Sequence, residues 1–169
     1  MKKYLICLLL ILLMGACGPV VSAPSMPHEM PDDFAFSIQF GVDKKNEINS
    51  YDGTVTKDLI ADGTITADIS LTSEEMNTVY ELMREVNILE EKELIPDPIF
   101  DEVCVQEPHE DDEWKITMNG ETIIISIDGT YCEPTKDAKQ LIQIRDAVFT
   151  MIKDKDEFKA LPDSTGGYD

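Results

Sequence analysis

The sequence predicts an α+β domain, an antiparallel sheet of about five to six strands with two helices packed on one face. Two observations predict it. Several short segments have apolar residues at every second position or are joined by turn residues, and two longer segments have apolar residues at helical spacing. Runs of strands that are each closed by a helix are typical of this class. The 169 residues allow one domain, which we expect to span residues 34–160.

A first strand is expected at residues 34–40. Phe34, Phe36, Ile38 and Phe40 alternate with smaller or polar residues, and this period of two marks a strand with one buried face. The following residues, 41–52, are polar and are expected to form a loop.

A hairpin is expected over residues 52–69, because two segments there repeat one another at a period of ten, the length of a strand plus a turn. A two-residue turn ending at Gly63 would mix apolar and polar residues on each face. A three-residue loop over 61–63, with Gly63 in the left-handed conformation, places Val55 opposite Ile69 and is therefore preferred.

A second hairpin is predicted around Asn119-Gly120, the pair of residues that type I′ turns favour. The pairs that follow from this turn are Ile116 with Ile123 and Trp114 with Ile125 on one face, and Thr117 with Thr122 on the other. Turn chemistry and hydrophobic pattern therefore agree on the register.

Two helices complete the domain. Thr72 and Glu75 form a capping box, in which each side chain can bond the other residue's backbone N–H, and this predicts a helix that ends near Asn87. A second helix is expected from about residue 134 or 135 to residue 155. With a short strand expected near residues 103–106, the order suggests that a unit of three strands and a helix occurs twice.

The N-terminus has the pattern of a bacterial signal peptide, which we assign to residues 1–16. Lys2 and Lys3 precede the uncharged residues 4–14, which as a helix would span only about 16 Å, half the hydrocarbon core of a bilayer. The two small residues before Cys17 resemble a lipobox, in which the cysteine receives diacylglycerol, gains acyl chains such as palmitate and becomes the new N-terminus. The alternative is an ordinary signal peptide whose cleavage site happens to precede a cysteine.

The charge balance excludes several classes of partner. The chain has 14 Lys+Arg against 34 Asp+Glu, a net charge of −20, and removal of residues 1–16 leaves 12 basic against 34 acidic residues, a net charge of −22. The basic footprint that nucleic acid or an anionic membrane surface requires is therefore missing.

We expect lipid to hold the protein at the outer face of the bacterial cytoplasmic membrane, with the proline-rich residues 17–33 as a tether and 161–169 as a C-terminal tail.

Two cysteines remain once Cys7 is assigned to the signal peptide and Cys17 to the lipid. In an exported domain we expect Cys104 and Cys132 to form one disulfide, which would close a loop of about 29 residues and contribute roughly 3 to 4 kcal/mol. Two free buried thiols are the alternative. A redox or metal pair is less favoured, because the sequence has neither Cys-x-x-Cys spacing nor a neighbouring histidine cluster.

The most acidic stretch, residues 107–113, is expected to be a solvated loop. Alternatively, its oxygen atoms could hold a divalent cation weakly, with a nitrogen ligand from the histidine. The weak candidates for metal ligands are Glu107, His109, Glu110, Asp111 and Asp112. The spacing fits no EF-hand, since the glycine and the terminal bidentate acid of that loop are missing.

Motifs of catalysis are absent from the sequence. It contains no Gly-x-Ser-x-Gly, no His-Glu-x-x-His and no phosphate-binding glycine loop, so we expect no catalytic residues and no cofactor. A pair of carboxylates with divergent pKa values would be needed for an enzyme and is the less favoured alternative.

Several short elements spread over the mature chain point to one family. They are Phe36 to Phe40 with Gly41-Val42-Asp43, Lys45-Asn46-Glu47, Asp52-Gly53-Thr54, Thr56-Lys57-Asp58, Leu71-Thr72 with Glu75, and Glu157 to Pro162 with Gly166-Gly167-Tyr168. On these elements the chain resembles a family of uncharacterised lipoproteins from Bacillus-type bacteria. The resemblance implies a lipid-anchored protein outside the cytoplasmic membrane and no particular activity, and it does not extend to the cysteine pair or the acidic stretch.

We therefore expect a non-catalytic domain that binds an envelope protein or a cell-wall component, with its anionic surface attracting cationic partners. Weak binding of a divalent cation by the 107–113 loop is the alternative function.

Overall fold

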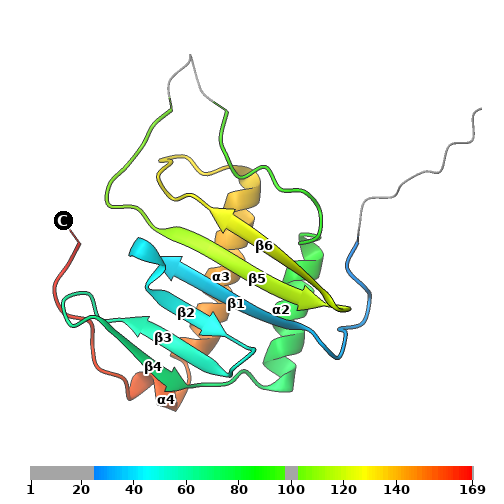
Figure 1. Cartoon of the computed structure of the whole chain (residues 1–169), viewed down its shortest axis with the longest axis horizontal. Coiled ribbons are helices and arrows are strands. Elements are labelled where there is room, and N and C mark those ends of the chain that lie inside the picture. Colours follow the sequence, from blue (N-terminus) through cyan, green and yellow to red (C-terminus); the bar gives the residue numbers. More distant parts are fainter. Residues whose placement is uncertain (1–24, 98–102, 169) are drawn as a thin grey trace, which may run out of the picture.

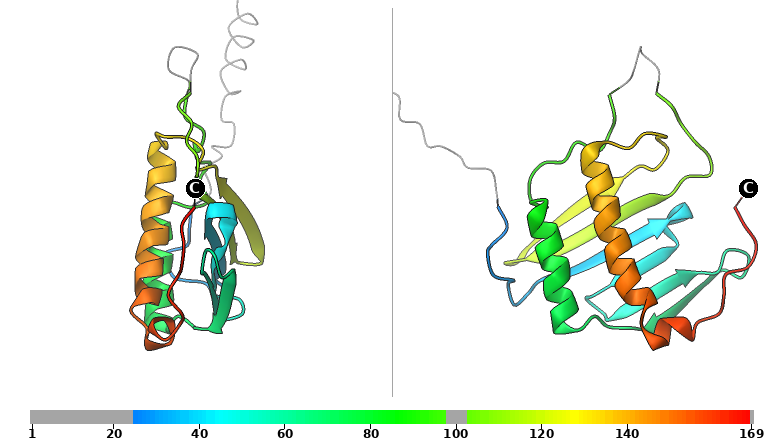
Figure 2. Two further views of the ribbon diagram at one scale, coloured as in Figure 1. Left: turned by 90° about the vertical axis from the view of Figure 1, so that its left-hand side faces the viewer. Right: turned by 180° about the vertical axis from the view of Figure 1, so that it is seen from behind.

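The computed structural model describes residues 25–97 and 103–168. The expected signal peptide and Cys17 lie outside the described residues. One antiparallel sheet of six strands has the order β4-β3-β2-β1-β5-β6, and the helices lie together on one of its faces (Figures 1 and 2). The predicted α+β class is therefore confirmed.

The strands and helices have the following bounds. The strands are β1 (Ala35–Gly41), β2 (Asn46–Asn49), β3 (Thr54–Asp58), β4 (Thr64–Asp68), β5 (Asp111–Met118) and β6 (Glu121–Ile127). The helices are α2 (Ser73–Glu85), α3 (Lys136–Lys153) and the short α4 (Asp156–Lys159), with a 3₁₀ turn η1 (Val42–Lys44) after β1.

The hairpin of β5 and β6 has the predicted register, including Ile116 opposite Ile123 and Trp114 opposite Ile125. Asn119 and Gly120 both have positive φ angles, 52° and 76°, as a type I′ turn requires. Asp33 holds the turn from outside, because its carboxylate accepts hydrogen bonds from the backbone N–H groups of Asn119 and Gly120.

The hairpin of β3 and β4 has a different register from the predicted one. Val55 lies opposite Ala67 and not Ile69, a shift of two residues that leaves the same residues on each face. The backbone N–H of Leu59 donates to Gly63 O at 2.8 Å, so the loop encloses 60–62 and not 61–63. The C-terminal tail contacts this loop, since Thr165 forms a parallel bridge with Ile60, and the local pattern of residues 52–69 contains no sign of such a distant contact. The positive φ expected at Gly63 is present, at 79°.

Strand β2 was predicted to be part of a polar loop, and this prediction was wrong. The strand lies inside the sheet and is paired on both sides, with Ile48 opposite Ile38 of β1 and opposite Val55 of β3. Ile48 is its one buried residue, and its other positions are polar. Backbone pairing with two neighbours therefore forms this strand without an alternating apolar pattern.

The short strand expected near residues 103–106 is a single bridge between Val105 and Tyr131. Among the described residues, four strands precede α2 and two precede α3. The suggested repeat of three strands and a helix is therefore wrong.

Both long helices begin as the sequence predicts. Thr72 and Glu75 form the capping box of α2, and Thr135 caps α3 by accepting a hydrogen bond from the N–H of Ala138. Their apolar faces cover the sheet residues around Trp114 and Phe36, which are fully buried. No helix among the described residues is both long and apolar enough to span a bilayer.

The described part of the predicted tether, residues 25–33, packs against the domain. Met26 is buried, and Tyr80 of α2 donates a hydrogen bond to the carbonyl of Pro27 at 2.8 Å. The tail is also bound, since the Tyr168 hydroxyl donates to the Asp58 carboxylate. The folded unit therefore extends beyond the predicted residues 34–160 at both ends.

Candidate functional site

The acidic stretch is only partly a loop, because β5 begins inside it at Asp111. Successive residues of a strand point to opposite faces. Asp112 therefore shares the core face with Trp114 and is 2% exposed, while Asp111 and Glu113 lie on the open face. The expectation of a uniformly solvated loop is wrong for Asp112.

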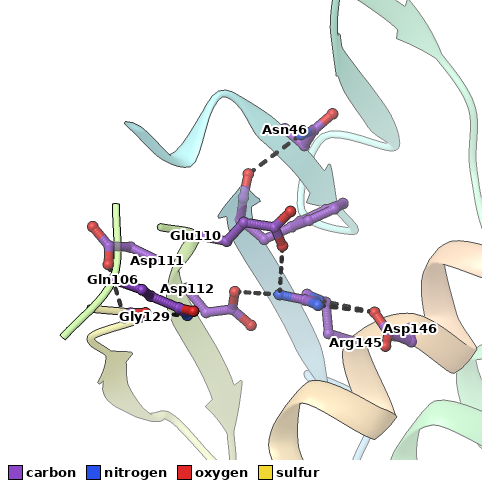
Figure 3. A network of polar contacts seen from close by, with 9 residues as sticks. Asn46, Gln106, Glu110, Asp111, Asp112, Gly129, Arg145 and Asp146 are labelled. Carbon is purple, nitrogen blue, oxygen red and sulfur yellow. Dashed lines mark hydrogen bonds and ion pairs between the residues drawn. The ribbon is translucent and has the colours of Figure 1, made fainter. Parts of the chain in front are cut away.

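Asp112 forms a buried ion pair with Arg145 of α3. The distance from Arg145 Nη1 to Asp112 Oδ1 is 2.7 Å, and the two side chains are 10% and 1% exposed. Figure 3 shows Arg145 between Asp112 and Glu110 on one side and Asp146 on the other. Asp146 accepts from both Nε and Nη2 of the guanidinium, whereas Glu110 lies 3.9 Å away. The pair thus joins the sheet to α3.

Burial raises the pKa of Asp112 above its ordinary value, although the charge of Arg145 and its hydrogen bond act in the opposite direction. Burial also opposes the charge on Arg145, but Asp112 and Asp146 outweigh it and raise the pKa of the guanidinium. The second oxygen, Asp112 Oδ2, and the indole nitrogen of Trp114 are buried without a hydrogen-bond partner among the described residues. The ion pair therefore leaves one buried carboxylate oxygen, Asp112 Oδ2, without a hydrogen bond.

A second group of charged side chains lies beside this pair. His109, Asp111 and Asp128 each offer one ligand atom, and these atoms all lie within 4.8 Å of one another. His109 Nε2 is 3.6 Å from Asp111 Oδ1, and His109 Nδ1 is hydrogen bonded to Glu107 at 3.0 Å. Asp128 is the residue that directly follows β6. We call His109, Asp111 and Asp128 the imidazole–carboxylate cluster.

The carboxylates of the cluster favour the protonated, positively charged form of the His109 imidazole. Desolvation lowers the pKa of His109, but the hydrogen bond to Glu107 and the charges of Asp111 and Asp128 outweigh it and raise that pKa above its ordinary value. Hydrogen bonds from Thr130 lower the pKa of Asp128, so this carboxylate stays ionised. The cluster therefore presents carboxylates around one imidazole.

The disulfide holds the two loops of the cluster together. The sulfur atoms of Cys104 and Cys132 are at bonding distance, with the Cα atoms 5.5 Å apart. The N–H of Gln106 donates to Thr130 O at 2.8 Å, and that of Cys132 donates to Cys104 O at 3.2 Å. The segment that leads to His109 is thereby tied to the segment that follows Asp128.

Gly129 allows these loops to approach closely. A Cβ atom at this position would lie 1.7 Å from the carbonyl oxygen of Glu110, which is a backbone atom. Its N–H donates to Asp111 at 3.0 Å. Only glycine fits here, because any side chain would push the acidic loop away from Asp128.

A hollow of about 360 Å³ opens beside the cluster and the ion pair. Its apolar wall comes from the loop before α3 and from α3, and its polar wall comes from the acidic loop and the end of β6. The hollow is lined by Tyr131, Pro134 and Ile142 on the apolar side, and by His109, Glu110, Asp128 and Arg145 on the polar side.

The five weak metal candidates thus separate into three groups. His109 and Asp111 lie together, Glu107 contacts the other nitrogen of the histidine, and Glu110 and Asp112 lie on the Arg145 side. Figure 3 shows Asp111 pointing away from Arg145, on the other side of the strand.

Two important residues, Asp128 and Arg145, were not foreseen. Arg145 lies four positions after Leu141 and so falls on the apolar stripe of its helix, which is a signal for a buried partner. Asp128 follows β6 directly, and the predicted hairpin register, which pairs Asp112 with Ile127, places it beside Asp111 and could have identified it.

Comparison of the chain with family models finds no match, and comparison with curated proteins finds none either. The resemblance to Bacillus-type lipoproteins therefore stays a prediction.

Proposed function

We propose that the chain is a lipid-anchored lipoprotein at the outer face of the bacterial cytoplasmic membrane, whose domain acts by binding and not by catalysis. The N-terminal pattern that ends in Cys17 supports the anchor. The main support for a location outside the cytoplasm is the Cys104–Cys132 disulfide, because disulfides persist in oxidising compartments and are rare in the cytosol.

The binding role is supported by charge. The mature chain has a net charge of −22, and such a field attracts cationic partners and repels an anionic leaflet. The partner that fits is an envelope protein or cell-wall component with a basic surface.

Cell fractionation tests the anchor and its side of the membrane. The full chain should be found in the membrane fraction and be digested by protease added to spheroplasts. Cys17→Ser should be released or kept as an uncleaved precursor, whereas the control Cys7→Ala should behave as the wild type. Membrane retention of a mature-size Cys17→Ser protein would contradict the proposal.

The second candidate function is divalent-cation binding by the imidazole–carboxylate cluster, and the convergence of three ligand atoms within 4.8 Å favours it. One imidazole and two carboxylates suit zinc or manganese better than calcium, which prefers oxygen ligands alone. Glu107 would orient the imidazole through Nδ1, as carboxylates commonly do for metal-bound histidine.

Calorimetry with zinc, manganese and calcium salts tests this candidate. Asp128→Asn should weaken zinc binding, while the control Asp163→Asn, an exposed acid outside the cluster, should not. No heat at millimolar metal, or equal loss in both variants, would remove this candidate and leave the lipoprotein proposal intact.

A further inference from the structure

The edge strand β6 lacks the usual protection against pairing with another strand. Residues 122–126 read Thr-Ile-Ile-Ile-Ser and contain no charge, proline or glycine. Its register with β5 is unbroken over seven pairs, so no bulge twists the edge away. The other edge strand, β4, is only five residues long and ends in Asp68.

The isoleucines of β6 are incompletely covered. Ile124 is 68% exposed on the open face of the sheet. Ile123 and Ile125 point to the helix side, yet they are only half-buried, whereas their partners on β5, Ile116 and Trp114, are fully buried. β6 forms one edge of the sheet, with β5 as its neighbour on the other side (Figure 1). The segment after α2 contacts the strand only from the helix side, where Leu89 lies near Ile123 and Ile95 near Ile127.

The hairpin turn determines which backbone groups of β6 point outward. Met118 and Glu121 flank the two-residue turn as a pair, so alternate residues from Glu121 onward bond to β5. The N–H and C=O groups of Thr122, Ile124 and Ser126 consequently point away from β5. No other described residue forms a backbone hydrogen bond with them.

We propose that β6 pairs antiparallel with β6 of a second copy of this chain, with Ile124 opposite Ile124. This register places Thr122 opposite Ser126, and Ile123 opposite Ile125, so hydroxyl groups meet hydroxyl groups and isoleucines meet isoleucines. Glu121 then lies opposite Ile127, and no carboxylate of the strand faces another.

The strand is thus complementary to itself in side-chain type and in charge, as an interface with two-fold symmetry requires. Pairing through one strand is small beside a standard stable interface, so the dimer is weak and depends on concentration. Attachment of two copies to one membrane would raise their effective concentration, although the pairing itself needs no anchor.

Cysteine crosslinking of the full chain in intact cells tests this register. Paired residues of this kind have Cα atoms about 5.5 Å apart, within the range of a disulfide. Ile124→Cys should therefore give a covalent dimer under mild oxidation. Thr122→Cys alone faces Ser126 and should give none, whereas Thr122→Cys with Ser126→Cys should crosslink again.

Two controls make the result specific. Thr66→Cys on β4 is an exposed site at the opposite edge and should stay monomeric. Mass mapping of the dimer should find the bond between the introduced cysteines, with Cys104 still joined to Cys132.

Three results would overturn the pairing: no dimer from Ile124→Cys, equal dimer from Thr66→Cys, or equal dimer from Thr122→Cys alone. A crosslink from Ile124→Cys to a different protein would also overturn it and would assign the edge to that protein. Sedimentation of the detergent-solubilised wild type should reveal a weak dimer that Ile124→Lys removes without changing the thermal midpoint. A wild type that is monomeric at every concentration would contradict the proposal.

Discussion

Arg145 Nη1 on α3 lies 2.7 Å from Asp112 Oδ1 near the start of β5, and this contact between two buried side chains joins α3 to the sheet. The same strand presents Asp111 on its other face to the imidazole–carboxylate cluster. The ion pair and the candidate cation site are therefore neighbours, and His109, Asp128 and Arg145 line the same hollow.

Removal of one partner of the ion pair should be costly. Arg145→Met leaves the Asp112 carboxylate buried and unpaired, and we expect a loss of about 3 to 5 kcal/mol in the free energy of unfolding. Asp112→Leu combined with Arg145→Met should recover much of this loss, because neither charge is then buried alone. Urea unfolding measures both, with Lys136→Met, an exposed site on α3, as the control. Additive losses in the double variant would contradict the pairing.

Gly129→Ala should displace the acidic loop. The new Cβ would meet the Glu110 carbonyl at 1.7 Å, so the backbone must shift, and we expect a destabilisation of about 1 to 3 kcal/mol. The imidazole resonances of His109 should change in the same variant. Gly167→Ala, where a Cβ would meet no atom within 4 Å, is the matched control and should be neutral. Unchanged His109 resonances in Gly129→Ala would refute this account of the loop.

Glu75 should make stability depend on pH in the acid range. Burial raises its pKa, but the hydrogen bond from Lys155 and the Thr72 cap outweigh it, so the folded-state pKa is lowered. A carboxyl with a lowered folded-state pKa adds stability above its unfolded-state pKa and loses it as pH falls through the folded-state value. Thermal unfolding from pH 6 to pH 2 should therefore show a contribution of about 1 kcal/mol that Glu75→Gln removes. Glu74→Gln, its neighbour in the first turn of α2, should keep this pH dependence.

Reduction of the disulfide should destabilise the domain. The bond joins residues 28 apart in sequence, and closure of such a loop contributes roughly 3 to 4 kcal/mol in the chain-entropy estimate. Cys104→Ser with Cys132→Ser should lose that amount in urea unfolding. Addition of dithiothreitol should lower the wild type to the same value and leave the double variant unchanged. A wild type that is indifferent to reductant would contradict a bond between these cysteines.

Local signals made the fold largely predictable. Asn119-Gly120 determines both a turn and a register, and Thr72 with Glu75 marks a helix start, so these elements could be found from neighbouring residues alone. Strand β2 could not be found in this way, since Ile48 is its one buried residue and pairing with β1 and β3 forms it. The loop between β3 and β4 also pairs with the distant Thr165, a contact that the local sequence does not reveal.

The candidate site was foreseen only in part. His109 and Asp111 are close in the sequence and were both among the five weak candidates for metal ligands. Asp128 could have been added from the predicted hairpin register, because the pairing of Asp112 with Ile127 places it beside Asp111. The partner of Asp112 lies 33 residues further along the chain, and such a distant contact leaves no local pattern.

The intact mass of the membrane-associated protein tests most directly whether lipid on Cys17 anchors this domain, as we propose. We expect a chain that begins at Cys17 and carries the added mass of diacylglycerol and acyl groups, with further metabolic labelling by a palmitate analogue that Cys17→Ser abolishes. A membrane-associated chain of unmodified mass, or one that begins at another residue, would contradict the claim.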